Sequence, residues 1–137
     1  MKTKIDLQLG DCIELMKNIP NESVNLVLSD PPYLINYKTN YRKNKTHDFC
    51  FTIQNDDNEL LIKNYFLECY RILKENSAAY IFCSAKQIEK FKLFINCTKF
   101  ILKNQIIWVK NNWTAGDLKA QFGQQYEIII LINKLRK

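Results

Sequence analysis

An acid, two prolines and a tyrosine stand together at the end of a short apolar segment. Asp30-Pro31-Pro32-Tyr33 follows residues 24–28, whose apolar side chains are typical of a strand buried on both faces of a parallel sheet. Two successive prolines lack the N–H donor that a sheet needs and fix φ, so the strand ends in a rigid turn. A carboxylate, prolyl carbonyl acceptors and a flat ring thereby lie at the carboxyl end of a strand, where ligands bind in open α/β sheets. As an alternative, the four residues form an ordinary turn in which Tyr33 merely packs.

The segment after this turn mixes aromatic and basic residues and shows no helical or strand periodicity. Its candidate nucleic-acid contacts are Tyr37, Lys38, Tyr41, Arg42, Lys43 and Lys45. Basic side chains would bind phosphates and aromatic rings would stack on an exposed base, so we expect a DNA-contacting loop. A solvated surface loop is the alternative interpretation. A second polar loop is expected at residues 111–125 and contains Trp113. We expect it to form another lip over the same site.

Composition indicates one globular domain with a polyanionic partner. The 137 residues suffice for one core, and 20 basic against 14 acidic residues leave a net charge of +6. No apolar run approaches the roughly 20 residues of a membrane span, and no signal-peptide pattern opens the chain. Five widely spaced cysteines without a C-x-x-C pair indicate a reduced, cytoplasmic protein. His47 and Cys50 lack a second ligand pair, so no metal site is expected.

Periodicity and capping signals predict the first elements. Residues 5–9 alternate apolar and polar side chains and predict a first strand. The D-x-x-E spacing at residues 11–14 predicts a helix to about residue 18, and the same spacing at residues 56–59 predicts a second helix to about residue 74. With the strand at residues 24–28, the first two elements predict a strand–helix–strand crossover unit.

The second half of the chain predicts three further strands. Residues 78–83 read as a buried strand, and residues 84–87 cap a helix that follows it. Strands at residues 105–109 and 128–132 have no helix between them, so an antiparallel hairpin is expected. The order of elements is that of an α/β fold.

Taken in order, three parts of the chain resemble the beta-arranged DNA amino-methyltransferases, and the resemblance covers nearly all of it. They are Leu9-Gly10-Asp11-Cys12 with residues 23–33, Tyr70-Arg71-Ile72-Leu73-Lys74 with residues 80–82, and Ile106-Ile107-Trp108-Val109-Lys110 with residues 126–129. The resemblance implies a partial Rossmann-like class I methyltransferase fold, mostly parallel, with a C-terminal antiparallel hairpin and helices on both sheet faces. Residues 1–137 would form a single, incomplete catalytic domain that supplies family strands three to seven.

The resemblance also implies a reaction. The cofactor would be S-adenosylmethionine, and the substrate would be an adenine flipped out of double-stranded DNA. Asp30 and the carbonyl of Pro31 would accept the hydrogens of the N6 amino group, with Pro32 keeping the turn rigid and Tyr33 stacking on the base. Asp11 and Asp30 would contact the cofactor, although capping of a helix explains Asp11 equally well. Trp108, Lys110 and Glu127 also match family positions.

The chain departs from the family pattern at its glycines. It has three, at positions 10, 116 and 123, so it contains no F-x-G-x-G cofactor segment and lacks family strands one and two. The interpretations are a fragment, a truncated gene product, or a chain that a second chain completes. We therefore expect a rearranged first strand or self-association through the broken edge. Three functions stay open: adenine-N6 methylation, cytosine-N4 methylation (where Ser-Pro-Pro-Tyr is more typical than Asp30), and a catalytically silent nucleic-acid-binding remnant.

Overall fold

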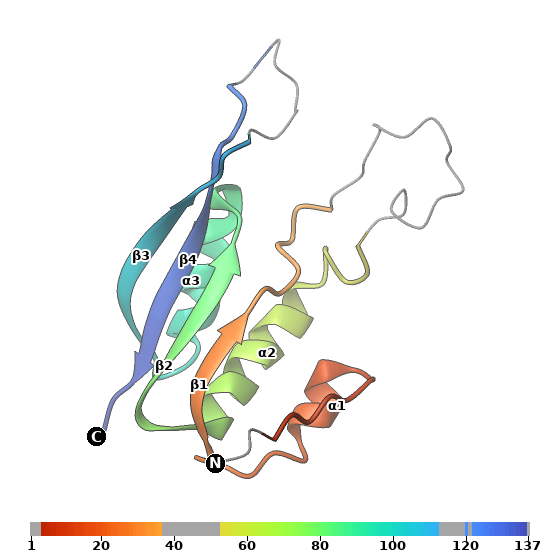
Figure 1. The fold of residues 1–137 in the computed structure, drawn as a ribbon, viewed down its shortest axis with the longest axis vertical. Helices are drawn as coiled ribbons and strands as arrows, with labels where there is room; N and C mark the ends of the chain where they lie inside the picture. Colours follow the sequence, from red (N-terminus) through yellow and green to blue (C-terminus); the bar gives the residue numbers. More distant parts are fainter. Residues whose placement is uncertain (1–3, 37–52, 113–119, 121, 137) are drawn as a thin grey trace.

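The computed structural model describes residues 4–36, 53–112, 120 and 122–136 (Figure 1). The elements are, in order, α1 (Cys12–Met16), β1 (Val24–Ser29), α2 (Glu59–Ile72), β2 (Leu73–Cys83), the short 3₁₀ helix η2 (Ala85–Gln87), α3 (Ile88–Asn96), β3 (Ile101–Val109) and β4 (Tyr126–Lys134).

The four strands form one sheet in the order β1-β2-β4-β3. β1 and β2 are parallel, with Leu28 beside Tyr80 and Ser29 beside Ile81. β4 is antiparallel to both β2 and β3. Three strands therefore point in one direction and only β4 opposes them, which confirms the expected mostly parallel sheet with an antiparallel C-terminal hairpin. The carboxyl ends of β1 and β2 lie at the same end of the sheet (Figure 1).

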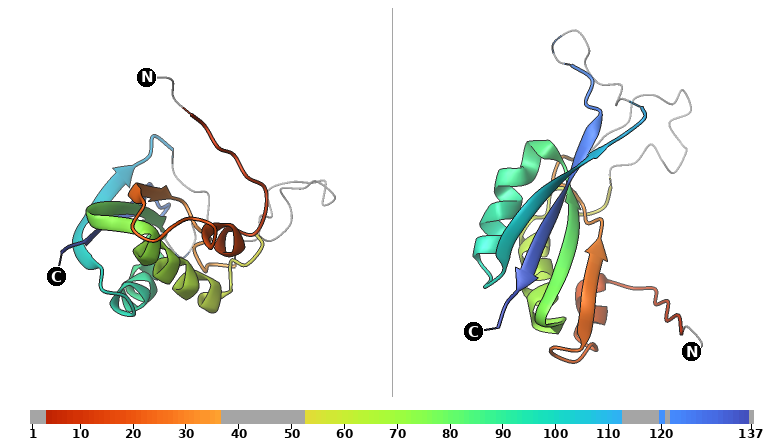
Figure 2. Two further views of the ribbon diagram at one scale, coloured as in Figure 1. Left: turned by 90° about the horizontal axis from the view of Figure 1, so that it is seen from below. Right: turned by 60° about the vertical axis from the view of Figure 1, so that its left-hand side comes forward.

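One face of the sheet packs against α2 and α3 and forms the core (Figure 2). Alternate residues of the two central strands point to that face, because side chains alternate along a strand. From the helices, the rings of Phe66 and Phe91 meet edge to face with centroids 5.9 Å apart. The buried strand residues are Ala79, Ile81 and Cys83 of β2, and Ile128, Ile130 and Ile132 of β4.

The opposite face of the sheet is open in the described part of the chain. Leu26 and Leu28 of β1 are 53% and 68% exposed, and Trp108 of β3 is 47% exposed. The prediction that residues 24–28 are buried on both faces was therefore wrong. A run of apolar residues shows that a strand is apolar on both sides, but it does not show which layer covers the second side.

The predicted first strand is absent from the described sheet. Residues 4–9 are extended but pair with no strand, and they run away from the body of the fold (Figure 2). Ile5, Leu7 and Leu9 are 85%, 92% and 103% exposed. Alternation specifies only the faces of a strand, and its backbone groups still need a neighbouring strand. β1 is an edge strand of the described sheet, so the predicted crossover unit does not form.

The helix starts were predicted with mixed success. Asp11 caps α1, and its Oδ1 accepts hydrogen bonds from the N–H groups of Ile13 and Glu14 at 2.9 and 3.2 Å, as predicted. The cap of α2 is Asn58, not Asp56, and its Oδ1 accepts from the N–H of Leu61 at 3.0 Å. Asp56 lies two residues too early to serve and is buried elsewhere.

Candidate active site

The four motif residues form a corner at the carboxyl end of β1. Asp30 is exposed at the end of the strand, Pro31 is buried beneath it, and Tyr33 is half-buried. Asp30 forms no ion pair with any other described residue. The prediction that the two prolines end the strand is confirmed, since β1 stops at Ser29. The corner thus holds the Asp30 carboxylate toward solvent, with the buried Pro31 directly after it in the chain.

Tyr33 reaches across the end of the sheet to the β3–β4 hairpin. Its hydroxyl lies 3.4 Å from Oε2 of Glu127, a residue 94 positions later in the chain. Glu127 also forms an ion pair with Lys110, and the Nζ of Lys110 lies 5.1 Å from the centroid of the Trp108 ring. The N–H of Lys110 donates to the carbonyl of Gln125 at 2.8 Å, which closes the hairpin at this level. Three residues that resemble family positions therefore gather beside the corner.

The phenol of Tyr33 is held in its neutral form. Burial raises its pKa above the ordinary value of 10, and the nearby carboxylates of Asp30 and Glu127 raise it further. A neutral phenol can donate a hydrogen bond to Glu127 while its ring stays uncharged. An uncharged ring is suited to stacking on a base.

Sequence reasoning missed two residues that support the corner from behind. Oδ1 of Asp56 accepts a hydrogen bond from the N–H of Leu34 at 2.9 Å, and Nε2 of Gln87 donates to the carbonyl of Leu34 at 2.9 Å. Asp56 is only 1% exposed. Its D-x-x-E spacing pointed to a capping box, and no sequence signal connects it with a residue 22 positions earlier.

The candidate cofactor residue Asp11 is exposed at the start of α1. Both described hydrogen bonds of its side chain go to Oδ1 and cap the helix. This supports the capping interpretation, and the proposed cofactor contact stays a prediction. The residues present fit S-adenosylmethionine only in part, because the chain contains no glycine-rich segment to hold it. No three described His, Cys, Asp or Glu residues are grouped as metal ligands.

All the candidate nucleic-acid contacts lie outside the described residues. They are Tyr37, Lys38, Tyr41, Arg42, Lys43, Lys45 and Trp113. Among the helices that are described, none combines the length and apolar character that crossing a membrane requires.

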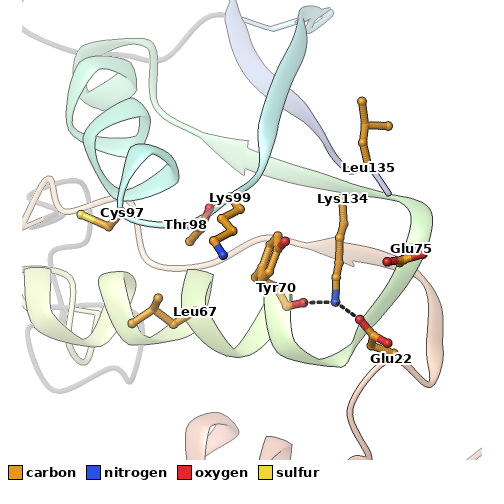
Figure 3. A pocket seen from close by; sticks show the side chains of 9 residues that line it. All are labelled: Glu22, Leu67, Tyr70, Glu75, Cys97, Thr98, Lys99, Lys134 and Leu135. Atoms are coloured by element: carbon orange, nitrogen blue, oxygen red, sulfur yellow. Dashed lines mark hydrogen bonds and ion pairs between the residues drawn. The ribbon is translucent and has the colours of Figure 1, made fainter. Parts of the chain in front are cut away.

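A hollow lies at the end of the sheet opposite the corner (Figure 3). Glu22, Tyr70 and Lys134 line it together with residues from the ends of α3 and β4. Lys134 is buried and donates to the carbonyls of Tyr70 and Leu73 at 3.0 and 2.8 Å, and it pairs with Glu22 at 3.0 Å. These contacts satisfy the carbonyls at the end of α2, so this lysine has a structural role.

Residues 24–137 match the family model described as DNA methylase. The chain therefore belongs to the DNA methylase family, which confirms the resemblance drawn from the sequence.

Two curated relatives match almost the whole chain. The Type II methyltransferase M.HinfI of Haemophilus influenzae is 28% identical over 135 residues, covering 93% of this chain and 38% of that protein. The DNA adenine methyltransferase YhdJ of Escherichia coli (strain K12) is 33% identical over 129 residues, covering 91% of this chain and 40% of that protein. The chain thus spans about two fifths of the length of these relatives.

Solved structures of similar proteins share the fold. PvuII DNA methyltransferase (cytosine-N4-specific) superposes with a TM-score of 0.68 at 13% identity, over 92% of this chain and 48% of that one. The M1.HpyAVI–SAM complex gives a TM-score of 0.57 at 18% identity, over 89% and 48%. These likenesses confirm the class I methyltransferase fold.

Proposed function

We propose that this chain carries the catalytic half of a DNA methyltransferase that modifies the N6 amino group of adenine. The observation that supports it is the corner at the carboxyl end of β1. Asp30 is exposed there on a rigid base of two prolines, with a neutral tyrosine beside it. YhdJ, a relative at 33% identity, is named a DNA adenine methyltransferase.

The chemistry follows from the substrate. The lone pair of an exocyclic adenine amine is delocalised into the ring, which makes it a poor nucleophile. Hydrogen bonds from its two N–H groups to the carboxylate of Asp30 and the carbonyl of Pro31 localise that lone pair on nitrogen. Tyr33 stacks on the flipped base and holds it in line, so that positioning supplies much of the rate. S-adenosylmethionine, when bound, supplies the methyl group.

The binding residues are part of the same proposal. Asp11 and Asp30 would contact the cofactor. The basic and aromatic side chains at positions 37, 38, 41, 42, 43 and 45, with Trp113, would bind double-stranded DNA around the flipped base. Electrostatic attraction from the net charge of +6 favours that partner. The site of action would be the cytoplasm, in keeping with the cysteine pattern.

We propose further that the working enzyme includes a second copy of the chain or a complementing chain. The open face exposes Leu26 and Leu28, and β1 leaves one edge of the described sheet unpaired. Edges of this kind bind other strands. Light scattering after size exclusion tests self-association, for which we expect a dimer, and a monomer at all concentrations would leave only the complementing chain.

The test of the reaction is identification of its product. The chain is incubated with unmethylated double-stranded DNA and S-adenosylmethionine, and the DNA is digested to nucleosides for mass spectrometry. We expect the product to be N6-methyldeoxyadenosine. The Asp30→Ala variant is the matched negative control. N4-methyldeoxycytidine would instead support cytosine methylation. No product, combined with no heat in a calorimetric titration of the cofactor, would favour a silent binding protein unless a partner restored activity.

A further inference from the structure

The residue immediately after the motif has an unfavourable backbone conformation. Leu34 has φ 60°, in the left-handed region. For a residue other than glycine this conformation is strained, and it persists only where the surroundings enforce it. Leu34 is also buried, at 7% exposure, so its side chain anchors the turn in the core. The direction of the chain behind Tyr33 therefore depends on whatever enforces this φ.

Two side chains from distant segments hold both peptide groups of Leu34. Asp56, which precedes α2, accepts from its N–H at 2.9 Å, and Gln87, at the end of η2, donates to its carbonyl at 2.9 Å. The bond to the Asp56 carboxylate is charge-assisted, and such bonds are stronger than those between neutral groups. The left-handed turn is thus fixed from two sides by groups outside the motif.

Asp56 is itself firmly placed. It is the only buried acid among the described residues. Its carbonyl accepts from the N–H of Asn36 at 3.3 Å, and its own N–H donates to the carbonyl of Ile53 at 3.3 Å. Burial of a carboxylate is costly unless hydrogen bonds compensate. The buried carboxylate of Asp56 lies directly behind the corner, where it accepts the hydrogen bond from Leu34.

We propose that Asp56 is a positioning residue for the Asp30–Tyr33 corner, acting through the left-handed turn at Leu34 with Gln87 as its partner. The reaction it serves rests on the proposed function. Without the Asp56 bond, Leu34 relaxes toward an extended φ, and Tyr33 and the Pro31 carbonyl shift with it. A displacement of about 1 Å at a reacting centre can reduce the rate by about 10²-fold.

The first test needs no activity. Amide hydrogen exchange of Leu34 and the ring resonances of Tyr33 are followed by NMR in the full chain. Asp56→Ala should speed exchange at Leu34 by at least about fivefold and shift the Tyr33 ring signals. Asp57→Ala, which removes the same charge from the exposed neighbouring residue, should do neither. Asp56→Asn keeps a carbonyl acceptor and should restore most of the protection. Unchanged exchange at Leu34 in Asp56→Ala would overturn the proposal.

The second test measures catalysis in the same variants. Asp56→Ala should lower the single-turnover rate of methyl transfer by about 10–100-fold while DNA affinity stays within about twofold, because only positioning is lost. If Asp56→Ala does not fold, Gln87→Ala replaces it in both tests. If both single variants fold, the double variant should be less than additive in exchange, since both side chains act on Leu34. Equal rates in Asp56→Ala and Asp57→Ala would overturn the proposal. Absence of methyl transfer in the wild type would count against the proposed function alone, and the NMR result would still decide the role of Asp56.

Discussion

The two ends of the sheet use their polar side chains in opposite ways. At the amino ends of β1 and β2, Lys134 is buried and its ammonium group binds two carbonyls and Glu22, with the Tyr70 ring 4.7 Å away. At the carboxyl ends, Asp30 is exposed and forms no ion pair with another described residue. A group whose hydrogen bonds are all made within the fold stabilises that fold. A group that a rigid turn holds toward solvent is available to a ligand.

The comparison predicts that the largest effect on activity comes from the exposed acid. Asp30→Ala should reduce methyl transfer by about 10²–10³-fold, the cost of removing one preorganised hydrogen-bonding group from a reacting centre. Its free energy of unfolding should change by less than about 0.5 kcal/mol, because surface substitutions away from packing contacts cost little. Chemical denaturation and single-turnover assays measure the two quantities. If the free energy of unfolding fell by as much as the activation free energy of methyl transfer rose, the assignment of Asp30 to the reaction would be contradicted.

The opposite pattern is expected for the buried lysine. Lys134→Met leaves the carbonyls of Tyr70 and Leu73 without their donor, so the free energy of unfolding should fall by about 2 kcal/mol. The control is Arg136→Met, whose ion pair with Glu75 is 3.7 Å long and whose side chain is 79% exposed, with an expected change below about 0.5 kcal/mol. Urea titrations distinguish the two. Equal urea midpoints for Lys134→Met and Arg136→Met would show that Lys134 has no structural role.

A smaller effect is expected where the hairpin meets the corner. Glu127→Gln removes the charge that pairs with Lys110 and weakens the acceptor of the Tyr33 hydroxyl, so methyl transfer should fall by about tenfold with the fold intact. Glu89→Gln is the matched control, since the Glu89 side chain is 79% exposed and pairs only at the surface of α3. If both variants retain full activity, the hairpin does not support the corner.

The smallest effect concerns alkaline pH. Burial raises the pKa of Tyr33, and Asp30 and Glu127 raise it further, so the folded state keeps the phenol proton when the unfolded chain releases it. The resulting stability is fully present below about pH 10 and is lost as pH rises above that value. Tyr33→Phe should therefore lose less stability between pH 9 and about 11 than the wild type. Tyr65, Cys69 and Cys83, whose pKa values are also raised by burial, contribute to the remaining loss. If the free energy of unfolding had the same slope against pH in Tyr33→Phe and in the wild type, the raised pKa of Tyr33 would be contradicted.

Local patterns predicted the parts of the fold that depend on local physics. Two prolines end β1 at Ser29, Asp11 caps α1, and the absence of a helix between β3 and β4 gives a hairpin. The first two outcomes depend on residues within a few positions of one another, and the hairpin depends on the absence of a helix from the single segment that joins the two strands. The sequence therefore predicted the corner and the order of the elements from α1 onward, but not the state of residues 5–9.

Features set by distant contacts were not predictable. Residues 5–9 have the alternation of a strand, yet only a neighbouring strand can satisfy their backbone groups. Leu26 has the character of a buried residue, yet burial requires a layer over that face. The contact from Asp56 to Leu34 likewise depends on the folded chain returning beside the motif. In all three, the deciding partner lies outside the local pattern.

The most direct test of the central claim is to locate the flipped base on the protein. Unmethylated duplex DNA carrying 5-iodouracil in place of individual adenines, where mispairing favours flipping, is irradiated with the chain, and cross-linked peptides are mapped by mass spectrometry. The account predicts a cross-link within residues 30–34 that diminishes when unsubstituted DNA competes. Cross-links confined to the opposite end of the sheet, around Lys134, would contradict it.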